Sequence, residues 1–117
     1  MKLAMVIIRP NMYYETSQAL IENGFYALTQ MEVMGRGKER MDYVTAEEEE
    51  ATPEFLYDMT AKRLIEVYIR DDQVDALVQA VLRVNQKNHS GDGKIFILPV
   101  DDGYRIRTGE TGTESIM

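Results

Sequence analysis

Two short segments of the chain combine glycines with a lysine in a pattern that suits phosphate binding. They are residues 35–38 (Gly-Arg-Gly-Lys) and 91–94 (Gly-Asp-Gly-Lys). Glycine lets main-chain N–H groups approach an anion closely, and the adjacent lysine adds a positive charge. Neither segment is a Walker A motif, which has four residues between its first glycine and the Gly-Lys-Ser/Thr sequence. Ordinary turns flanked by solvated lysines are the alternative explanation.

The polar segment 101–117, at the C-terminal end of the chain, supplies two further cations, Arg105 and Arg107. Side chains two residues apart in an extended segment point to the same side, so this pair could form a two-pronged clamp on an anion. Six of the 13 Lys and Arg residues fall in or beside these three segments: Arg36, Lys38, Arg40, Lys94, Arg105 and Arg107. In a chain with a net charge of −7, this clustering favours a site for a phosphorylated ligand.

Acidic residues with the spacing of a catalytic pair are not evident. Glu66 is expected in the middle of a strand, on the same side as Leu64 and Tyr68, where a half-buried carboxylate needs a hydrogen-bond donor. An adenine amino group or a neighbouring lysine would serve, and an internal salt bridge is an equal alternative. Asp71 and Asp72 occupy positions that are typical of helix caps.

The composition excludes several classes of site and partner. The chain has 117 residues, no cysteine and one histidine, His89, which is expected to be solvated in a polar loop. Disulfides and thiolate metal sites are therefore excluded, and a Ser-His-Asp site is disfavoured. The acidic charge argues against a nucleic-acid partner, because such domains carry a basic surface. No apolar run approaches about 18 residues, so we expect a soluble, cytoplasmic protein that does not insert into membranes.

Four strands and two helices are predicted to position the candidate residues. The strands are expected at residues 3–8, 25–34, 64–69 and 94–100. The first helix is expected to begin at its N-cap, Asn11, and to end near Glu22, before the Asn23-Gly24 stop signal. The second follows Asp72, because apolar residues at positions 74, 77, 78, 81 and 82 have the spacing of an amphipathic helix.

The order of these elements indicates a duplicated unit within a single domain, residues 1–117. Residues 6–11 (VIIRPN) and 67–72 (VYIRDD) form a weak internal repeat. The pattern predicts an α+β, ferredoxin-like double βαβ sandwich, with both helices on one face of a four-stranded antiparallel sheet. Both alternating sets of side chains in the first strand are apolar, so we expect a homo-oligomer that buries the uncovered face. A tightly packed central strand is the alternative.

Residues 38–61, between the second and third strands, lack any periodicity. Compact domains rarely keep so long a structureless connection unless it has a function, so we expect a regulatory loop. Its four consecutive glutamates, 47–50, are typical of a solvated surface. Residues 52–54 (Thr-Pro-Glu) resemble a helix start, which would make Phe55, Leu56 and Met59 an exposed apolar contact for a partner.

Several motifs together resemble those of the PII signal-transduction family over nearly the whole chain. They are residues 7–10 (IIRP), 35–38 (GRGK), 71–74 (DDQV), 91–100 (GDGKIFILPV) and 105–110 (RIRTGE), of which the last two are close to diagnostic. The resemblance implies a homotrimer of ferredoxin-like subunits that binds ATP or ADP in clefts between neighbours. It also implies that the loop 38–61 presents the nucleotide state to a target protein.

The resemblance also assigns binding residues by position. Those expected around the phosphates and ribose are Gly35, Gly37, Lys38, Gly91, Asp92, Gly93, Lys94, Arg105 and Arg107. Those expected around the base are Ile7, Thr29, Glu66 and Tyr68. Lys62 matches the lysine that helps to hold the effector 2-oxoglutarate in the family.

The chain departs from the family pattern at Glu39, where the family usually has a glutamine that helps to hold Mg²⁺ and 2-oxoglutarate. A carboxylate can ligate Mg²⁺ as a hard oxygen donor, but it repels a dicarboxylate unless the metal screens the charge. Tyr43 and Tyr57 are not clean counterparts of the tyrosine that is uridylylated in some members, so no uridylylation is expected. Residues 35–38 followed by residues 41–43 (MDY) resemble the nitrogenase-associated branch, which regulates nitrogenase by binding it.

Three classes of function are compatible with these features. In the leading hypothesis the protein is a non-catalytic regulator, in which ATP and ADP compete for one cleft and bias the loop between conformations. Its target would be a nitrogen-metabolism protein such as nitrogenase, or alternatively a transporter. The second is a slow nucleotide-hydrolysing enzyme, for which Glu39 is the only plausible base. The third, a ferredoxin-like RNA binder, would need a basic surface and is disfavoured by the acidic charge.

Overall fold

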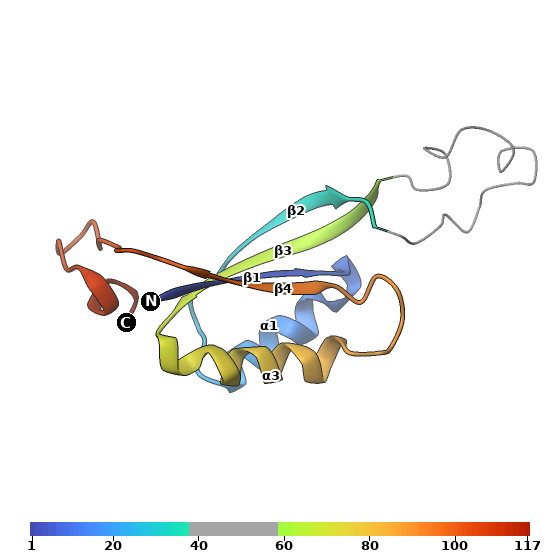
Figure 1. Cartoon of the computed structure of the whole chain (residues 1–117), viewed down its shortest axis with the longest axis horizontal. Helices are drawn as coiled ribbons and strands as arrows, with labels where there is room; N and C mark the ends of the chain where they lie inside the picture. The colour runs from blue at the N-terminus through green and yellow to red at the C-terminus, as the bar shows by residue number, and fades with distance from the viewer. Residues whose placement is uncertain (38–58) are drawn as a thin grey trace, which may run out of the picture.

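The computed structural model describes residues 1–37 and 59–117, which form one sheet and one layer of helices (Figure 1). Four antiparallel strands make up the sheet, in the order β2-β3-β1-β4. The strands are β1 (Lys2–Ile8), β2 (Thr29–Gly35), β3 (Thr60–Ile69) and β4 (Lys94–Pro99). The helices are α1 (Tyr13–Glu22) and α3 (Val74–Asn85), with short 3₁₀ helices η1 (Pro10–Met12), η3 (Asp71–Gln73) and η4 (Gly112–Ile116).

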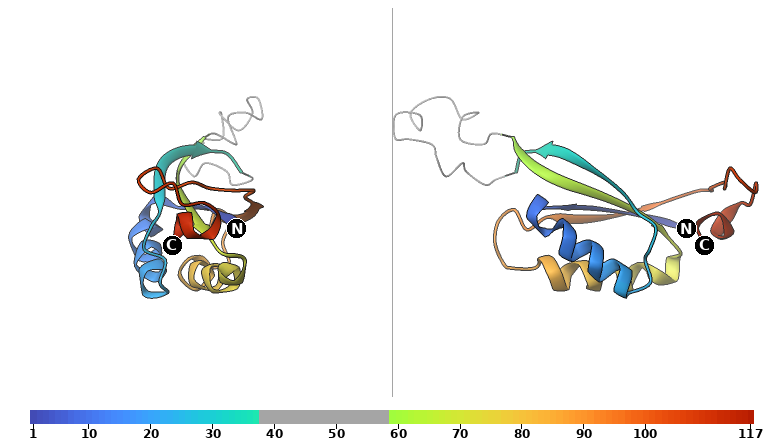
Figure 2. Two further views of the ribbon diagram at one scale, coloured as in Figure 1. Left: turned by 90° about the vertical axis from the view of Figure 1, so that its left-hand side faces the viewer. Right: turned by 180° about the vertical axis from the view of Figure 1, so that it is seen from behind.

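Each helix connects two strands of the sheet. Helix α1 joins β1 to β2, helix α3 joins β3 to β4, and both lie on the same face of the sheet (Figure 2). The predicted α+β, ferredoxin-like double βαβ arrangement is therefore confirmed. No helix among the described residues is both long enough and apolar enough to cross a membrane.

The hydrophobic core lies between the sheet and the helices. Ala4, Val6 and Ile8 point into it from β1 and are at most 1% exposed. They pack with buried residues of α1, β3 and α3, among them Leu20, Ile65, Val67, Ile69, Leu77 and Val81. Burial of an aliphatic side chain of this size stabilises a fold by about 1.5–3 kcal/mol, so this layer fixes which side of each strand faces the helices.

We call the opposite side of the sheet the open face, because no helix of the described residues covers it. Strand pairing aligns its side chains in rows across β3, β1 and β4: Tyr68-Leu3-Leu98, Glu66-Met5-Phe96 and Leu64-Ile7-Lys94. Tyr68 and Phe96 are each 46% exposed. An apolar surface of this kind is typical of an interaction surface, which agrees with the apolar character of both sides of the first strand.

The internal repeat marks the points where β1 and β3 leave the sheet. Arg9 and Arg70 both have an extended backbone, and each immediately precedes a 3₁₀ helix. The prediction that Asn11 caps the first helix is wrong, because Asn11 lies inside η1 and no side chain caps α1. Pro10 opens η1 instead, since its fixed φ suits a first helical position.

Asp71 and Asp72, which follow β3, do not have the predicted role of helix caps. Asp71 accepts a hydrogen bond from the amino-terminal nitrogen of Met1 at 2.8 Å, and Asp72 accepts one from Arg70 Nε at 3.0 Å. Neither caps a helix. The side chain of Gln73 accepts a hydrogen bond from Arg70 N at 2.9 Å and so stabilises the start of η3.

A buried polar link joins the two helices. Thr16 Oγ1 in α1 donates to the main-chain oxygen of Met12 at 2.7 Å and accepts from Asn85 Nδ2 in α3 at 3.0 Å. Asn85 Nδ2 also donates to the main-chain oxygen of Val81 at 3.0 Å. The Thr16 hydroxyl and the Asn85 Nδ2 group are thereby satisfied within the helical layer, whereas Asn85 Oδ1 is buried without a hydrogen-bond partner among the described residues.

Two strand boundaries differ from those predicted by more than one residue. Strand β2 begins at Thr29 rather than Phe25, because Phe25 turns back onto α1: its main-chain nitrogen donates to Leu20 O at 2.8 Å and its side chain enters the core. Strand β3 begins at Thr60, which pairs with Gly35, so residues 60 and 61 of the predicted loop belong to the strand. The rest of that loop through residue 58 lies outside the described residues.

Candidate functional site

Eight of the candidate residues, including Ile7, lie together at one end of the sheet, which we call the glycine-turn end. Gly35 and Gly37 lie at and beyond the end of β2, and Lys62 follows in β3. The turn 91–94 leads into β4, where Lys94 pairs with Ile7. Lys62 Nζ donates to Gly91 O at 3.4 Å and so connects the β3 strand to this turn.

Gly93 is required at this end for packing within the chain. Its φ of +120° is a conformation that residues with a side chain rarely adopt. A Cβ atom at this position would lie 2.1 Å from Ile7 O, so only glycine lets the turn pack directly on β1. The sequence suggested that glycine here lets the main chain approach an anion closely. In the structure, the main chain at Gly93 instead closely approaches the neighbouring strand β1.

Asp92 organises the turn 87–92 rather than pointing away from it. Its Oδ2 accepts hydrogen bonds from Lys87 N at 2.8 Å and His89 N at 3.1 Å, and its Oδ1 accepts one from Arg9 Nη1 at 3.0 Å. The main-chain N–H groups of His89 and Lys87, with the Arg9 guanidinium, hold the pKa of the Asp92 carboxyl below its ordinary value of 3.8.

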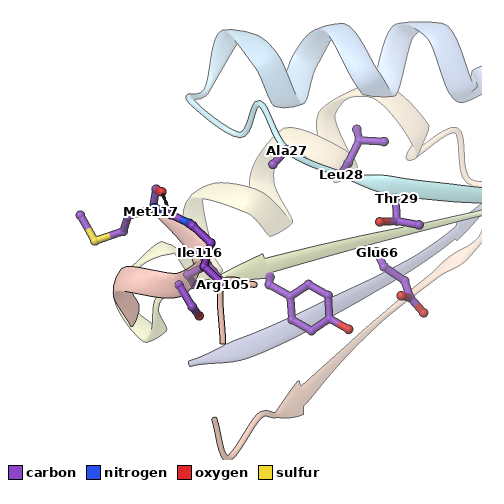
Figure 3. A pocket seen from close by; sticks show the side chains of 9 residues that line it. Ala27, Leu28, Thr29, Glu66, Arg105, Ile116 and Met117 are labelled. Carbon is purple, nitrogen blue, oxygen red and sulfur yellow. Dashed lines mark hydrogen bonds between the residues drawn. The ribbon is translucent and has the colours of Figure 1, made fainter. Parts of the chain in front are cut away.

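Four other candidate residues gather toward the opposite end of the sheet, which we call the arginine end. A cavity of about 330 Å³ there brings together Thr29 of β2, Glu66 and Tyr68 of β3, and Arg105 (Figure 3). Its remaining lining comes from Ala27, Leu28, Ser115, Ile116 and Met117. The cavity therefore joins three of the four residues expected around a base to one of the arginines expected around phosphates.

Glu66 is half-buried in this cavity without a protein partner. Pairing of Thr29 with Glu66 and of Glu66 with Met5 places its side chain on the open face, as predicted. Within the described part of the chain, no hydrogen bond or salt bridge is made by its carboxylate. The internal salt bridge considered from the sequence is therefore not formed with any of these residues, and the carboxylate can accept a hydrogen bond from a ligand.

Arg105 is held by its own chain. Its Nη1 donates to Glu110 Oε1 at 3.2 Å, and its Nη2 donates to the main-chain oxygens of Glu114, at 3.0 Å, and Met117. The predicted extended clamp is wrong, because residues 106–108 form a turn that Gly109 N closes by donating to Arg105 O at 2.6 Å. Arg107 lies in that turn and is exposed.

The two ends are separated along the strands. Strand β4 begins at Lys94, beside the glycine turns, and ends at Pro99, before the segment that carries the arginines. Its six residues span roughly 20 Å at about 3.3 Å per residue. Figure 1 shows the C-terminal segment at the left of the molecule and the turn before β4 at the right. One copy of the chain therefore holds the candidate residues in two separate groups.

Two parts of the cavity wall were missed by the sequence reasoning. Ala27 and Leu28 were assigned to a strand, and residues 115–117 were treated as part of a polar tail. The turn signal at Gly109, with φ +76°, could have indicated that the chain folds back toward Arg105. Lys38 and Glu39 lie outside the described residues, and the described residues contain no group of three acidic or histidine side chains that could hold a metal.

Comparison with known proteins identifies the family to which the chain belongs. The family model described as "Nitrogen regulatory protein P-II" matches residues 1–110. The chain belongs to the PII family. It is 38% identical to "Nitrogen fixation nifHD region GlnB-like protein 2" of Methanothermobacter marburgensis, over 99% of this chain and 100% of that protein. The PII family is one of nitrogen regulatory proteins, which agrees with the expectation of a regulator rather than an enzyme.

Two further relatives carry the family name itself. "Nitrogen regulatory protein P-II 2" of Methanothermobacter thermautotrophicus is 36% identical, over 99% of this chain and 97% of that protein. "Nitrogen regulatory protein P-II" of Microchaete diplosiphon is 38% identical, over 99% of this chain and 100% of that protein. The PII family membership predicted from the motifs is therefore confirmed, and the nifHD-region name supports the nitrogenase-associated branch.

Proposed function

We propose that this PII protein is a regulator that binds ATP or ADP in clefts between the subunits of a homotrimer. Its output would be the conformation of the loop between β2 and β3. ATP differs from ADP by one phosphate and its associated Mg²⁺, a charge difference large enough to bias a loop between two states. The target would be a nitrogen-metabolism protein, with nitrogenase favoured by the nifHD-region name of a relative.

The observation that carries this proposal is the division of the candidate residues between two ends of one chain. The described residues of the glycine-turn end offer main-chain N–H groups and lysines. The arginine end offers the Glu66 carboxylate, an apolar wall and Arg105. The glycine turns and the segment that carries the arginines lie at opposite ends of β4, roughly 20 Å apart. The phosphates of one nucleotide would therefore contact both only when one of these segments comes from a second copy.

The open face supports the assembly that this cleft requires. Its rows across β3, β1 and β4 are mostly apolar, and burial of such a surface contributes about 25 cal/mol for each Å² removed from water. A homotrimer that buries these faces together would bring the glycine-turn end of one subunit to the arginine end of the next.

The candidate residues suggest how each part of the nucleotide would be held. Glu66 would accept a hydrogen bond from the adenine amino group, beside Thr29, Tyr68 and the partner copy's Ile7. The phosphates and ribose would lie against the two glycine turns, with Lys38, Lys94, Arg105 and Arg107 supplying positive charge. Glu39 would ligate Mg²⁺, and 2-oxoglutarate would reach Lys62 only with that metal in place.

Titration calorimetry with ATP and ADP, each with and without Mg²⁺ and 2-oxoglutarate, tests the proposal. We expect both nucleotides to bind, and light scattering to give a mass near 40 kDa, three times the 13.4 kDa of one chain. Absence of binding by both nucleotides at millimolar concentration, or a monomer in dilute solution, would contradict it.

The variant Arg105→Ala/Arg107→Ala separates binding from assembly. We expect it to weaken nucleotide binding by about tenfold or more, because charge-assisted hydrogen bonds to phosphate are lost. The trimer should remain intact by light scattering. Loss of the trimer in this variant would instead make the arginines structural. Phosphate release at many turnovers per second that vanishes in Glu39→Gln would favour a hydrolytic enzyme over a regulator.

A further inference from the structure

The last six residues of the chain, 112–117, form a short strap across the arginine end. Gly112 N anchors the strap by donating to Gly103 O at 3.2 Å and to Asp102 Oδ1 at 3.0 Å. Beyond that anchor, Ile116 and Met117 form part of the wall of the cavity that contains Glu66 (Figure 3).

Beyond Gly112, the hydrogen bonds that attach the strap to the rest of the described chain involve one side chain. Its Ser115 Oγ and Met117 N make hydrogen bonds only within the strap. The hydrogen bonds that join residues 113–117 to the other described residues all end on Arg105, through the main-chain oxygens of Glu114 and Met117. Ile116 is half-buried, whereas Met117 at the end of the strap is 72% exposed.

These contacts use the donors that Arg105 would need to grip a phosphate. A guanidinium binds an oxyanion through two parallel N–H groups, either Nη1 with Nη2 or Nε with Nη2. Both pairs include Nη2, which carries two hydrogens. In this structure Nη2 donates to Glu114 O and to Met117 O, so both of its hydrogens are engaged. Arg105 can then offer single N–H groups to an anion but no two-pronged contact.

We propose that the strap competes with nucleotide phosphates for Arg105. Residues 113–117 must detach from Arg105 before its guanidinium can bind a phosphate through two parallel N–H groups. This inference rests on the proposed nucleotide site. The salt bridge from Arg105 Nη1 to Glu110, at 3.2 Å, does not involve the strap and can hold the arginine side chain near the cavity after release. Nucleotide binding and strap release are then coupled: bound nucleotide favours release of the strap, and release of the strap raises the affinity for nucleotide by the same factor.

The test compares the full chain with a chain that ends at Thr111, using titration calorimetry with ATP as the probe. We expect the truncated chain to bind ATP roughly three- to tenfold more tightly, because Arg105 no longer has to exchange partners. The same truncation in an Arg105→Lys background is the matched control. A lysine cannot form the two parallel N–H contacts of a guanidinium, so the truncation should change ATP affinity in that background by less than about twofold.

Each result separates this inference from the function on which it rests. Equal or weaker binding by the truncated chain, with the full chain still binding ATP, would overturn the competition and leave the proposed function in place. Tightening of the same size in the Arg105→Lys background would also overturn it, since the effect would not pass through Arg105. If neither chain binds ATP, the proposed function itself fails.

Hydrogen exchange gives a second measurement that needs no truncated chain. We expect ATP to speed amide exchange at residues 113–117 of the full-length protein, because the strap loses its hydrogen bonds to Arg105. Slower exchange in this segment on addition of ATP would mean that the strap closes over the nucleotide, which would overturn the inference.

Discussion

The glycine-turn end and the arginine end of the open face are built in different ways. At the glycine-turn end, shape is set by main-chain packing: Gly93 lies against β1, and Asp92 holds the turn through two main-chain N–H groups. At the arginine end, shape is set by one guanidinium and the strap that it binds. If the proposed nucleotide site is correct, each subunit would supply one set of residues held by main-chain packing and one arginine that must exchange its hydrogen-bond partners.

Substitution of Gly93 should have the largest effect and tests the rigid end. In Gly93→Ala the new Cβ would meet Ile7 O at 2.1 Å, at a φ of +120° that alanine disfavours. We expect a loss of about 3 kcal/mol or more in the free energy of unfolding, measured by chemical denaturation.

Gly37→Ala is the matched control for that measurement. Apart from its chain neighbours, no atom of residues 1–37 and 59–117 lies within 4 Å of the position that its Cβ would occupy, so we expect a change of no more than about 0.5 kcal/mol. If the two alanine variants were equally stable, the main-chain packing would not be what gives the glycine-turn end its shape.

Replacement of Glu66 tests the arginine end with a smaller expected effect. In Glu66→Leu we expect ATP affinity to fall about tenfold, since the acceptor for the adenine amino group is lost, equivalent to about 1.4 kcal/mol. The free energy of unfolding should stay the same or rise, because the half-buried carboxylate has no partner among the described residues.

Glu66→Gln refines that experiment. Its amide oxygen keeps an acceptor at the same position, so calorimetry should show an ATP affinity between those of the wild type and Glu66→Leu. A stability loss in Glu66→Leu with unchanged ATP affinity would make Glu66 a structural residue and would remove the base pocket from the arginine end.

The smallest effect concerns pH, and it again distinguishes the two ends. The pKa of Asp92 is lowered in the folded protein, so its contribution to stability is present above its ordinary value of 3.8 and is lost as pH falls through the lower folded-state value. We expect Asp92→Asn to lower the Tm at neutral pH and to reduce the fall in Tm as the solution is acidified.

Asp71→Asn is the comparison variant at the other end. The pKa of Asp71 is lowered mainly by its hydrogen bond from the amino terminus, and its side chain is 67% exposed, so solvent screens the interaction. Thermal unfolding across an acid pH series should therefore show a smaller change for Asp71→Asn than for Asp92→Asn. The opposite order would indicate that the Asp92 hydrogen bonds add little to the rigid end.

The parts of the fold that could be predicted were those set by periodicity. The apolar residues on both sides of β1 indicate a strand that packs on both faces, and the helical spacing from Val74 to Leu82 indicates an amphipathic helix. The side of the sheet on which Glu66 lies follows from its neighbours in the strand. The start of β2 could not be predicted, because Phe25 has strand-like neighbours but enters the core from a turn after α1. Local pattern does not reveal that tertiary choice.

The candidate site was predictable residue by residue but not in its arrangement. The motifs identified the glycines, Glu66 and Arg105, whereas the division between two ends follows from the order β2-β3-β1-β4 and the direction in which β4 leaves the sheet. The partners of Arg105 were not predictable either. Two of them are main-chain oxygens, which carry no signal in side-chain type.

The buried link from Thr16 to Asn85 bears on how a signal could cross the molecule. Its hydroxyl and amide groups have no water to exchange with, so sliding α1 along α3 would break hydrogen bonds without replacing them. The two helices are therefore expected to act as a stationary platform. Conformational coupling between the proposed binding clefts would then pass through the strand ends and the segments attached to them.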